Sequence, residues 1–192
     1  MTAVVQGQTT YNQFPAFAQP GQLADLAYAE IVSFPAAEVI QPGRMVEIAS
    51  DNLSCQQVQD SGATTPPAKM LGFSLLQTAR EGAGAVGITG YGVGGVAYAI
   101  GDTVPVLTRG RLYAEWKGTT QPAWQNGANG SGGLHVYSSS TTATDRGKLT
   151  DAAVSSSSGS EVLYAGSGVR CRGALSGTGN IILVDVNLPG AA

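Results

Sequence analysis

The chain has 192 residues, of which 43% are hydrophobic and only 12% are charged, and its formal net charge is −3. Because soluble domains carry roughly 25% charged residues, this surface is expected to be solvated by hydroxyl and amide groups or partly covered by neighbouring subunits. The small negative charge gives no basic footprint for nucleic acid. The sequence also offers no membrane-spanning segment and no secretory signal, and its length fits one domain or one domain with an arm.

The first region, residues 1–34, is predicted to be an extended N-terminal arm. Tyr11, Phe14 and Phe17 lie there among Gln, Thr and Pro residues, and prolines keep the segment extended or turned. Residues 23–34 are expected to form a short helical turn followed by a strand. Because the segment has aromatic residues but no periodic core face, it is expected to pack against its own domain or against a partner.

The second region, residues 35–117, is predicted to form short strands separated by turns. The turn signals are Gln41–Gly43 and Asp51–Asn52. The expected strands cover residues 39–40, 45–49, 54–59, 70–77 and 96–100, with a polar loop at 60–68 and a glycine loop at 82–95.

Residues 101–117 have the clearest strand pattern in the chain. Two apolar segments are expected to flank a Thr108–Gly110 turn. In the second segment, side chains alternate between an apolar and a polar face, which is typical of a half-buried strand. The apolar face contains Leu112, Ala114 and Trp116, and the polar face contains Arg111, Tyr113, Glu115 and Lys117. Pro105 predicts that the first segment is an edge strand or contains a bulge, because proline cannot donate a ladder hydrogen bond.

The third region contains two long polar loops, at about 118–133 and 138–160. Strands are expected at 134–137, 162–165, 168–172 and 180–188. In the last of these, Ile182, Val184, Val186 and Leu188 share one face. Many short strands with turns between them predict an all-β fold, a small antiparallel β-barrel or sandwich covering residues 35–192.

No residue cluster predicts catalysis or a cofactor. Residues 82–87 match G-x-G-x-x-G, but the following residues are too rich in glycine to begin the helix that a dinucleotide requires. A Ser-His-Asp set would have to use His135, the only histidine, with Asp145 or Asp151 nearby. His135 lies in a predicted strand, however, and no nucleophile elbow is present.

The acidic residues and the few metal-ligating residues are interpreted in the same way. Zinc would need more His or Cys ligands than the chain has. The carboxylates that could pair for acid–base chemistry are interpreted as solvated: Glu30, Glu38, Glu47, Glu115 and Asp185. The sequence therefore predicts no enzyme, no cofactor and no metal.

Cysteine and tryptophan residues each allow two interpretations. Cys55 and Cys171 are interpreted as buried free thiols, with a disulfide between them as the alternative. Trp116 follows the apolar period and is expected in a core or an interface. Trp124 lies in a predicted loop, where it would be an interface anchor or a cap on the core.

Four sequence elements together resemble the structural cement, or head decoration, proteins of tailed bacteriophages. They are an aromatic arm followed by Pro20–Asp25, a Pro-Gly-Arg strand start in Gln41–Val46, the segment Ile100–Leu107 before a Gly-Arg turn, and the closing strand Ile181–Leu188. The Ser-rich stretch after His135 is the part that aligns least.

The resemblance implies a non-catalytic virion protein, made in the host cytoplasm, that binds the outer surface of the phage head. It implies the major capsid protein and further copies of the chain, often as a homotrimer, as partners. On this basis Tyr11, Phe14 and Phe17 are expected to anchor the arm. Arg80, Arg109, Arg111 and Trp124 are expected to make further partner contacts.

Three other functions are compatible with the sequence. A phage tail, baseplate or fibre component would assemble into rings or filaments. A hydrolase would depend on His135, and a carbohydrate-binding module would need exposed aromatic residues in the 118–133 loop, where only Trp124 qualifies.

Overall fold

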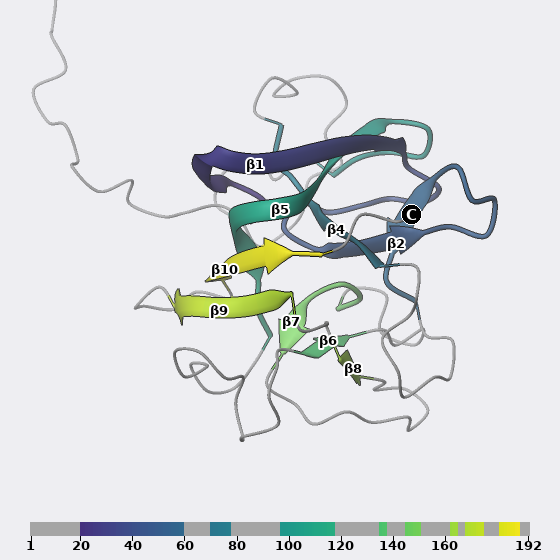
Figure 1. Cartoon of the computed structure of the whole chain (residues 1–192). Coiled ribbons are helices and arrows are strands. Elements are labelled where there is room, and N and C mark those ends of the chain that lie inside the picture. The colour runs from purple at the N-terminus through teal and green to yellow at the C-terminus, as the bar shows by residue number, and fades with distance from the viewer. Residues whose placement is uncertain are drawn as a thin grey trace, which may run out of the picture.

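A computed structural model of the chain (Figure 1) describes residues 20–59, 70–77, 97–117, 135–137, 145–150, 162–164, 168–174 and 181–188. Every regular element in these ranges is a β-strand, which confirms the predicted all-β class. Within the same ranges, no helix has the length and hydropathy needed to cross a membrane. Several residues selected from the sequence lie outside the described ranges: Tyr11, Phe14, Phe17, Arg80, Trp124 and the 82–95 loop.

The strands form one large and one small antiparallel sheet. The large sheet has the order β3-β2-β4-β5-β10-β9, and its seventh strand, β1, pairs with β5. Its strands are β1 (Leu23–Pro35), β2 (Met45–Ile48), β3 (Cys55–Gln57), β4 (Met70–Ser74), β5 (Thr103–Glu115), β9 (Val169–Ala174) and β10 (Ile181–Asn187). The small sheet has the order β7-β6-β8, formed by β7 (Leu149–Thr150), β6 (His135–Tyr137) and β8 (Val162–Tyr164). The large sheet is open rather than a closed barrel.

Strand β5 is the central strand of the large sheet, because it pairs with β1, β4 and β10. β1 pairs with residues 103–112 of β5, whereas β4 pairs with 106–107 and β10 with 109–115. A residue has only one hydrogen-bonding partner on each side, so β4 and β10 must share one edge of β5, and β1 occupies the other. Figure 1 shows β1, β5, β10 and β9 following one another across the molecule.

The predicted turn at Thr108–Gly110 is wrong, because β5 runs without interruption through these residues. The two apolar segments do not pair with each other. Instead, β1 pairs with both of them, from Thr103 to Leu112. Gly110 absorbs the local irregularity with a φ of 134°, a value that favours glycine.

The β1–β5 pairing shifts register at Thr108, between Leu107 and Arg109, in agreement with the bulge predicted from the proline. The edge-strand alternative is wrong, because Pro105 lies in the middle of the sheet. Its carbonyl accepts a hydrogen bond from the Leu75 amide at 2.8 Å. Leu75 comes directly after β4, which ends at Ser74. The missing N–H of Pro105 therefore faces the end of β4, where no further ladder bond is required.

The helical turn expected within residues 23–34 is also wrong, because β1 is a strand over its whole length. The edge of β5 provides partners along this segment, and tertiary pairing overrides weak local preferences. Residues 23–34 of the predicted arm are therefore part of the large sheet.

The apolar face predicted for residues 111–117 is confirmed, because Leu112, Ala114 and Trp116 are buried. They pack in a core cluster with Ile182, Val184 and Val186, the face predicted for the closing strand. A second cluster lies around Ile40, Val46, Leu71, Tyr98 and Val106. The interpretation of Glu47 and Glu115 as solvated is wrong, because only 6% and 3% of these residues is exposed.

Both cysteines are free and buried, which confirms the interpretation preferred from the sequence. They lie in different core clusters. Burial raises the pKa of Cys55 to about 11. Since the thiolate is the reactive form, Cys55 acts as a small core residue.

Two of the Pro-Gly elements noted in the sequence meet in the fold. Gly21 and Gly43 both have a φ of 78° and face each other so closely that a Cβ on either would lie within 3 Å of the other's nitrogen. The Gly21 amide donates to the Tyr113 carbonyl at 2.7 Å, and the Leu76 amide donates to the Gly21 carbonyl at 2.9 Å. These contacts fix where the chain enters the sheet.

Candidate functional site

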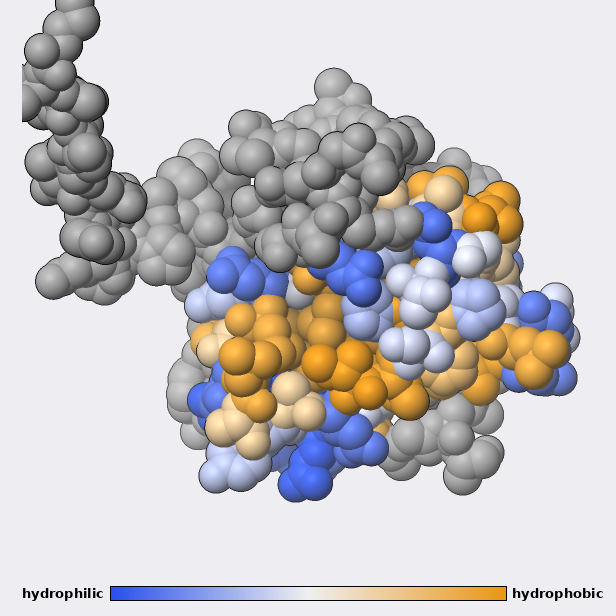
Figure 2. All heavy atoms as spheres, turned by 90° about the horizontal axis from the view of Figure 1, so that it is seen from above, coloured by the Kyte–Doolittle hydropathy of each residue, from blue (hydrophilic) through white to orange (hydrophobic). Residues whose placement is uncertain are grey.

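The largest exposed apolar side chains of β1 lie on its central part. Leu26 is 82% exposed and Tyr28 is 77% exposed, and Ile31 and Val32 are each more than 40% exposed. Figure 2 views the molecule from the side on which β1 lies in Figure 1, and it shows hydrophobic atoms gathered at that surface. Large, exposed apolar side chains that cluster on one element indicate an interaction surface.

A bulge in β1 produces this exposure. Asp25 pairs with Arg111 and Glu30 pairs with Arg109, so residues 26–29 of β1 all lie opposite the single residue Gly110. A Cβ on Gly110 would lie 3.2 Å from the Ala29 Cα, which shows how closely the two backbones approach. The extra residues must project from the sheet, and they carry Leu26 and Tyr28 into solvent.

An open pocket of about 320 Å³ lies between this bulge and β10. It is lined by Asp25, Tyr28, Arg109, Gly110, Arg111, Asp185, Val186 and Asn187. Two of the arginines selected from the sequence, Arg109 and Arg111, therefore meet in one place. The other selected residues lie outside the described part of the chain.

The two arginines differ in their partners. The Arg111 Nε lies 2.7 Å from Asp185 Oδ1, and its NH1 lies 4.0 Å from Asp25 Oδ2. The hydrogen bond to Asp185 raises the pKa of Arg111 above its usual value. Arg109 is exposed and has no hydrogen bond or ion pair to any residue in the described ranges. It is the cation of the pocket that is available to a partner.

Leu26 and Tyr28 were not selected from the sequence, although the sequence contains a signal for them. The large apolar residues of β1 stand at 23, 26, 28, 31, 32 and 34, so a strict alternation is broken three times. Broken alternation within a strand is a sign of a bulge. Only the partner strand shows which residues the bulge exposes.

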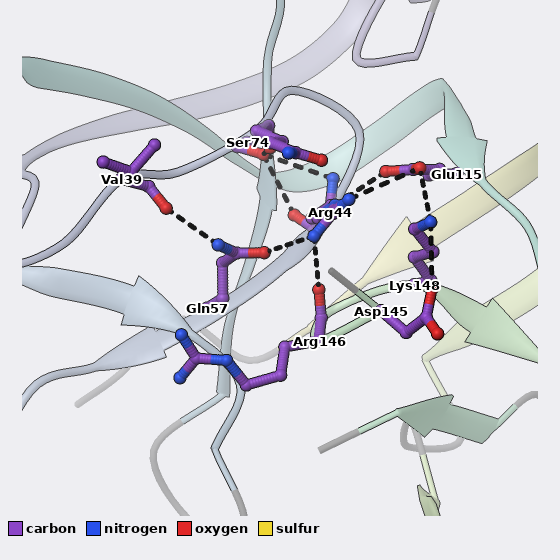
Figure 3. A network of polar contacts seen from close by, with 9 residues as sticks. Val39, Arg44, Gln57, Ser74, Glu115, Asp145, Arg146 and Lys148 are labelled. Carbon is purple, nitrogen blue, oxygen red and sulfur yellow. Dashed lines mark hydrogen bonds and ion pairs between the residues drawn. The ribbon is translucent and has the colours of Figure 1, made fainter. Parts of the chain in front are cut away.

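A second polar cluster is buried and centred on Arg44 (Figure 3). The Arg44 Nε donates to Glu115 Oε2 at 2.7 Å, and its NH1 donates to Gln57 Oε1 at 2.8 Å and to the Arg146 carbonyl at 3.2 Å. The side chains of Arg44 and Glu115 are both 3% exposed. The cluster joins the start of β2 to β3, β5 and the 145–148 segment.

Two lysine residues extend this cluster with further ion pairs. The Lys148 Nζ lies 3.1 Å from Glu115 Oε1 and 3.1 Å from Asp145 Oδ1, and Lys117 also pairs with Asp145. Burial acts to raise the pKa of Asp145, but the hydrogen bonds from Lys117 and Lys148 outweigh it and hold the pKa below its usual value. Each of the two carboxylates is therefore held by two cations, which ties β5 to the 145–148 segment.

Of the residues considered for catalysis, the structure describes the backbone of His135 and the contacts of Asp145. His135 lies on β6, and Asp145 is held by two lysines. Asp151 lies outside the described residues. Within the described part of the chain, no group of three His, Cys, Asp or Glu side chains is placed to hold a metal ion.

One comparison with known proteins identifies a family, and another identifies a similar fold. Residues 7–187 match the family model described as structural cement protein (E217 gp24/Pam3 gp6). No curated protein matches the chain. The fold is similar to a chain in the structure titled the capsid of Myoviridae phage XM1, with a TM-score of 0.61 and 14% identity over 93% of this chain and 98% of that chain. Because the family model spans nearly the whole sequence, the chain belongs to the phage structural cement protein family.

Proposed function

We propose that the chain is a capsid cement protein, which binds the outer surface of an assembled phage head and bridges neighbouring major capsid subunits. The observation that carries this proposal is the family match over residues 7–187. The protein would act in the virion through contact area alone, stabilising the shell against internal pressure without making or breaking a covalent bond.

The surface on β1 supports this proposal. Leu26 and Tyr28 provide apolar anchors of the kind that dominate interface energies, and Arg109 adds a charged contact at their side. Arg111 is a further contact at the rim of the same pocket. A shell offers many identical sites, so moderate contacts on each copy add up when copies are linked as a homotrimer.

The N-terminal arm is the second binding element in this proposal. Tyr11, Phe14 and Phe17 would insert between capsid subunits or onto a sister copy, with Arg80 and Trp124 as additional contacts. The arm, residues 1–34, would thus begin as a free binding segment and end as strand β1. Residues 35–192 would form the β domain that carries it.

Deletion of residues 2–19 tests the proposal. The described sheet begins after this segment, so the variant should fold with an unchanged melting temperature. Its binding to expanded phage heads in cosedimentation should weaken at least about tenfold, because several aromatic anchors are lost. Unchanged binding would refute the role of the arm. Rings or filaments of the purified protein in negative stain would favour a tail component instead.

A pair of matched variants distinguishes the loss of the aromatic anchors from the loss of arm length. Replacing Tyr11, Phe14 and Phe17 with serine keeps the length of the arm and removes its apolar contacts. Replacing Gln6, Gln8 and Gln13 with serine changes the same number of residues but no aromatic ring. Only the first variant should lose binding to heads.

A further inference from the structure

The outer edge of β1 is open for strand addition over a short, defined stretch. The Ala36 amide donates to the Asp102 carbonyl, and the pairing continues in register through Phe34–Val104 and Val32–Val106. Hydrogen-bonded residues alternate in an antiparallel ladder. The backbone groups of Ile31, Ser33 and Pro35 therefore point away from β5.

The hydrogen bonds of β5 lead to the same conclusion about which backbone groups of β1 point outward. The Pro105 carbonyl bonds to Leu75 on the far edge of β5, so Pro105 does not bond to Ser33, its neighbour in register. In the part of the chain that the structure describes, β1 pairs with β5 alone. The amides of Ile31 and Ser33 are thus outward donors, and exposed apolar side chains accompany them.

This open stretch is bounded on both sides. The bulge at residues 26–29 interrupts the ladder before it, and Pro35 has no amide to donate after it. Long open edges promote aggregation, and bulges and prolines are common protection against it. An edge that is open only between a bulge and a proline can pair with one short strand but not with a long one.

We propose that this edge binds residues Thr9–Phe14 of the N-terminal arm of a neighbouring copy. Residues 1–19 contain no Asp, Glu, Lys, Arg or His, so the arm brings no charge to an apolar edge. Thr9–Phe14 is free of Gly and Pro and contains Thr, Tyr and Phe, which favour strands. This inference rests on the proposed function, because it assigns a sister copy as one partner of the arm.

The entry of the chain into the sheet favours a neighbouring copy over the same copy. Gly21 is locked between Gly43 and Leu76, beside β2 and β4, rather than beside the open edge of β1. Phe14 is six residue steps from Pro20, which span at most about 20 Å. Each copy supplies one arm and one edge, so a closed homotrimer would satisfy all of them.

Cross-linking between differently tagged copies tests this assignment. Asn12→Cys is placed in one copy and Ser33→Cys in the other, the two are co-expressed, and a short bismaleimide is added. Protein with only the buried native cysteines is the background control. Cross-links between the two tags are expected. Cross-links confined to a single chain carrying both substitutions, or none while both thiols react with a monofunctional maleimide, would overturn the proposal.

A backbone substitution tests the hydrogen bond itself. Ser33→Pro removes an outward amide that the β1–β5 ladder does not use, and Ser33→Ala keeps that amide. Ser33→Pro should raise the concentration at which the oligomer dissociates about fivefold, the value of one hydrogen bond, with a melting temperature close to that of Ser33→Ala. Equal dissociation of both variants would overturn the proposal. Cosedimentation with heads, run in parallel, reports separately on the proposed function.

Discussion

The guanidinium of Arg44 donates hydrogen bonds to Glu115, Gln57 and the Arg146 carbonyl, and the backbone amide of Arg44 donates to Ser74 Oγ. A guanidinium presents several donors in a fixed plane, so one side chain can satisfy several acceptors at once. The buried pair with Glu115 is therefore part of how the strands are held in register. Removing one member would leave the other charge without compensation.

Glu115→Gln should lower the free energy of unfolding by about 3 kcal/mol, because Arg44 and Lys148 would remain buried beside a neutral amide. Urea denaturation measures this. Glu30→Gln, the same chemical change at an exposed position of β1, is the matched control and should leave the midpoint nearly unchanged. Equal effects of the two substitutions would contradict the structural role of the cluster.

From the ion pairs of Asp145 we predict how the stability of the protein changes in acid. Its pKa in the folded state is below the usual value of about 3.9, so its ion pairs stabilise the fold fully above that pH. This contribution is lost as pH falls through the lower folded-state pKa. In urea midpoints measured from neutral to acidic pH, Asp145→Asn should lower stability at neutral pH and flatten the decline below about pH 4. An unchanged acid profile would refute this contribution.

At the scale of the elements, close contact between backbones decides several positions. The Pro20–Gly21 and Pro42–Gly43 elements fit together only because neither glycine has a Cβ. Gly72 is similar, since a Cβ there would lie 2.1 Å from the Leu107 carbonyl oxygen where β4 meets β5. Both sites bring segments that are distant in sequence into direct backbone contact.

Gly43→Ala should therefore destabilise the fold much more than Gly101→Ala. Both glycines have positive φ, and an alanine pays roughly 1–2 kcal/mol for that conformation at either position. At Gly101 nothing lies within 4 Å of the added Cβ, whereas at Gly43 it would lie 2.6 Å from the Gly21 nitrogen. Thermal unfolding of the two variants measures the difference. Similar losses would show that the contact relaxes easily.

At the scale of the whole molecule, the inner strands of the large sheet carry mostly buried side chains, whereas those of β1 are largely exposed. The low charge of the sequence and the apolar side chains on β1 agree with a subunit that shares surface with neighbours. Because Leu26 and Tyr28 are more than three-quarters exposed, they add little to the stability of the isolated chain. Their exposure is consistent with a role in assembly.

Replacing both Leu26 and Tyr28 with serine should leave the melting temperature nearly unchanged and weaken binding to phage heads at least about tenfold, as expected for interface anchors. Cosedimentation measures the binding. Leu53, which is 75% exposed in a turn away from β1, provides a control, and Leu53→Ser should bind normally. Normal binding by the Leu26 and Tyr28 variant would exclude the bulge from the interface.

Many of the strands and their buried faces could be predicted from the sequence. The alternation in 111–117 and 181–187 correctly gives Leu112, Trp116 and Val184 as core residues, and turn residues mark many of the boundaries. These features are local, because the side chains of a strand alternate between its faces whatever lies across from it. The cysteines were predicted to be free and buried because disulfides are rare in proteins made in the cytosol, a reason that does not depend on the fold.

The amino-acid sequence by itself thus determined the all-β class and the buried faces of β5 and β10. Only the tertiary structure decided that β5 continues through Gly110, that Glu115 is buried with Arg44, and that a bulge exposes Leu26 and Tyr28. Each of these depends on which strand lies across the sheet. Such pairing joins residues 70 to 90 positions apart in the chain, as in Leu23–Leu112 and Glu115–Arg44, so no local pattern contains it.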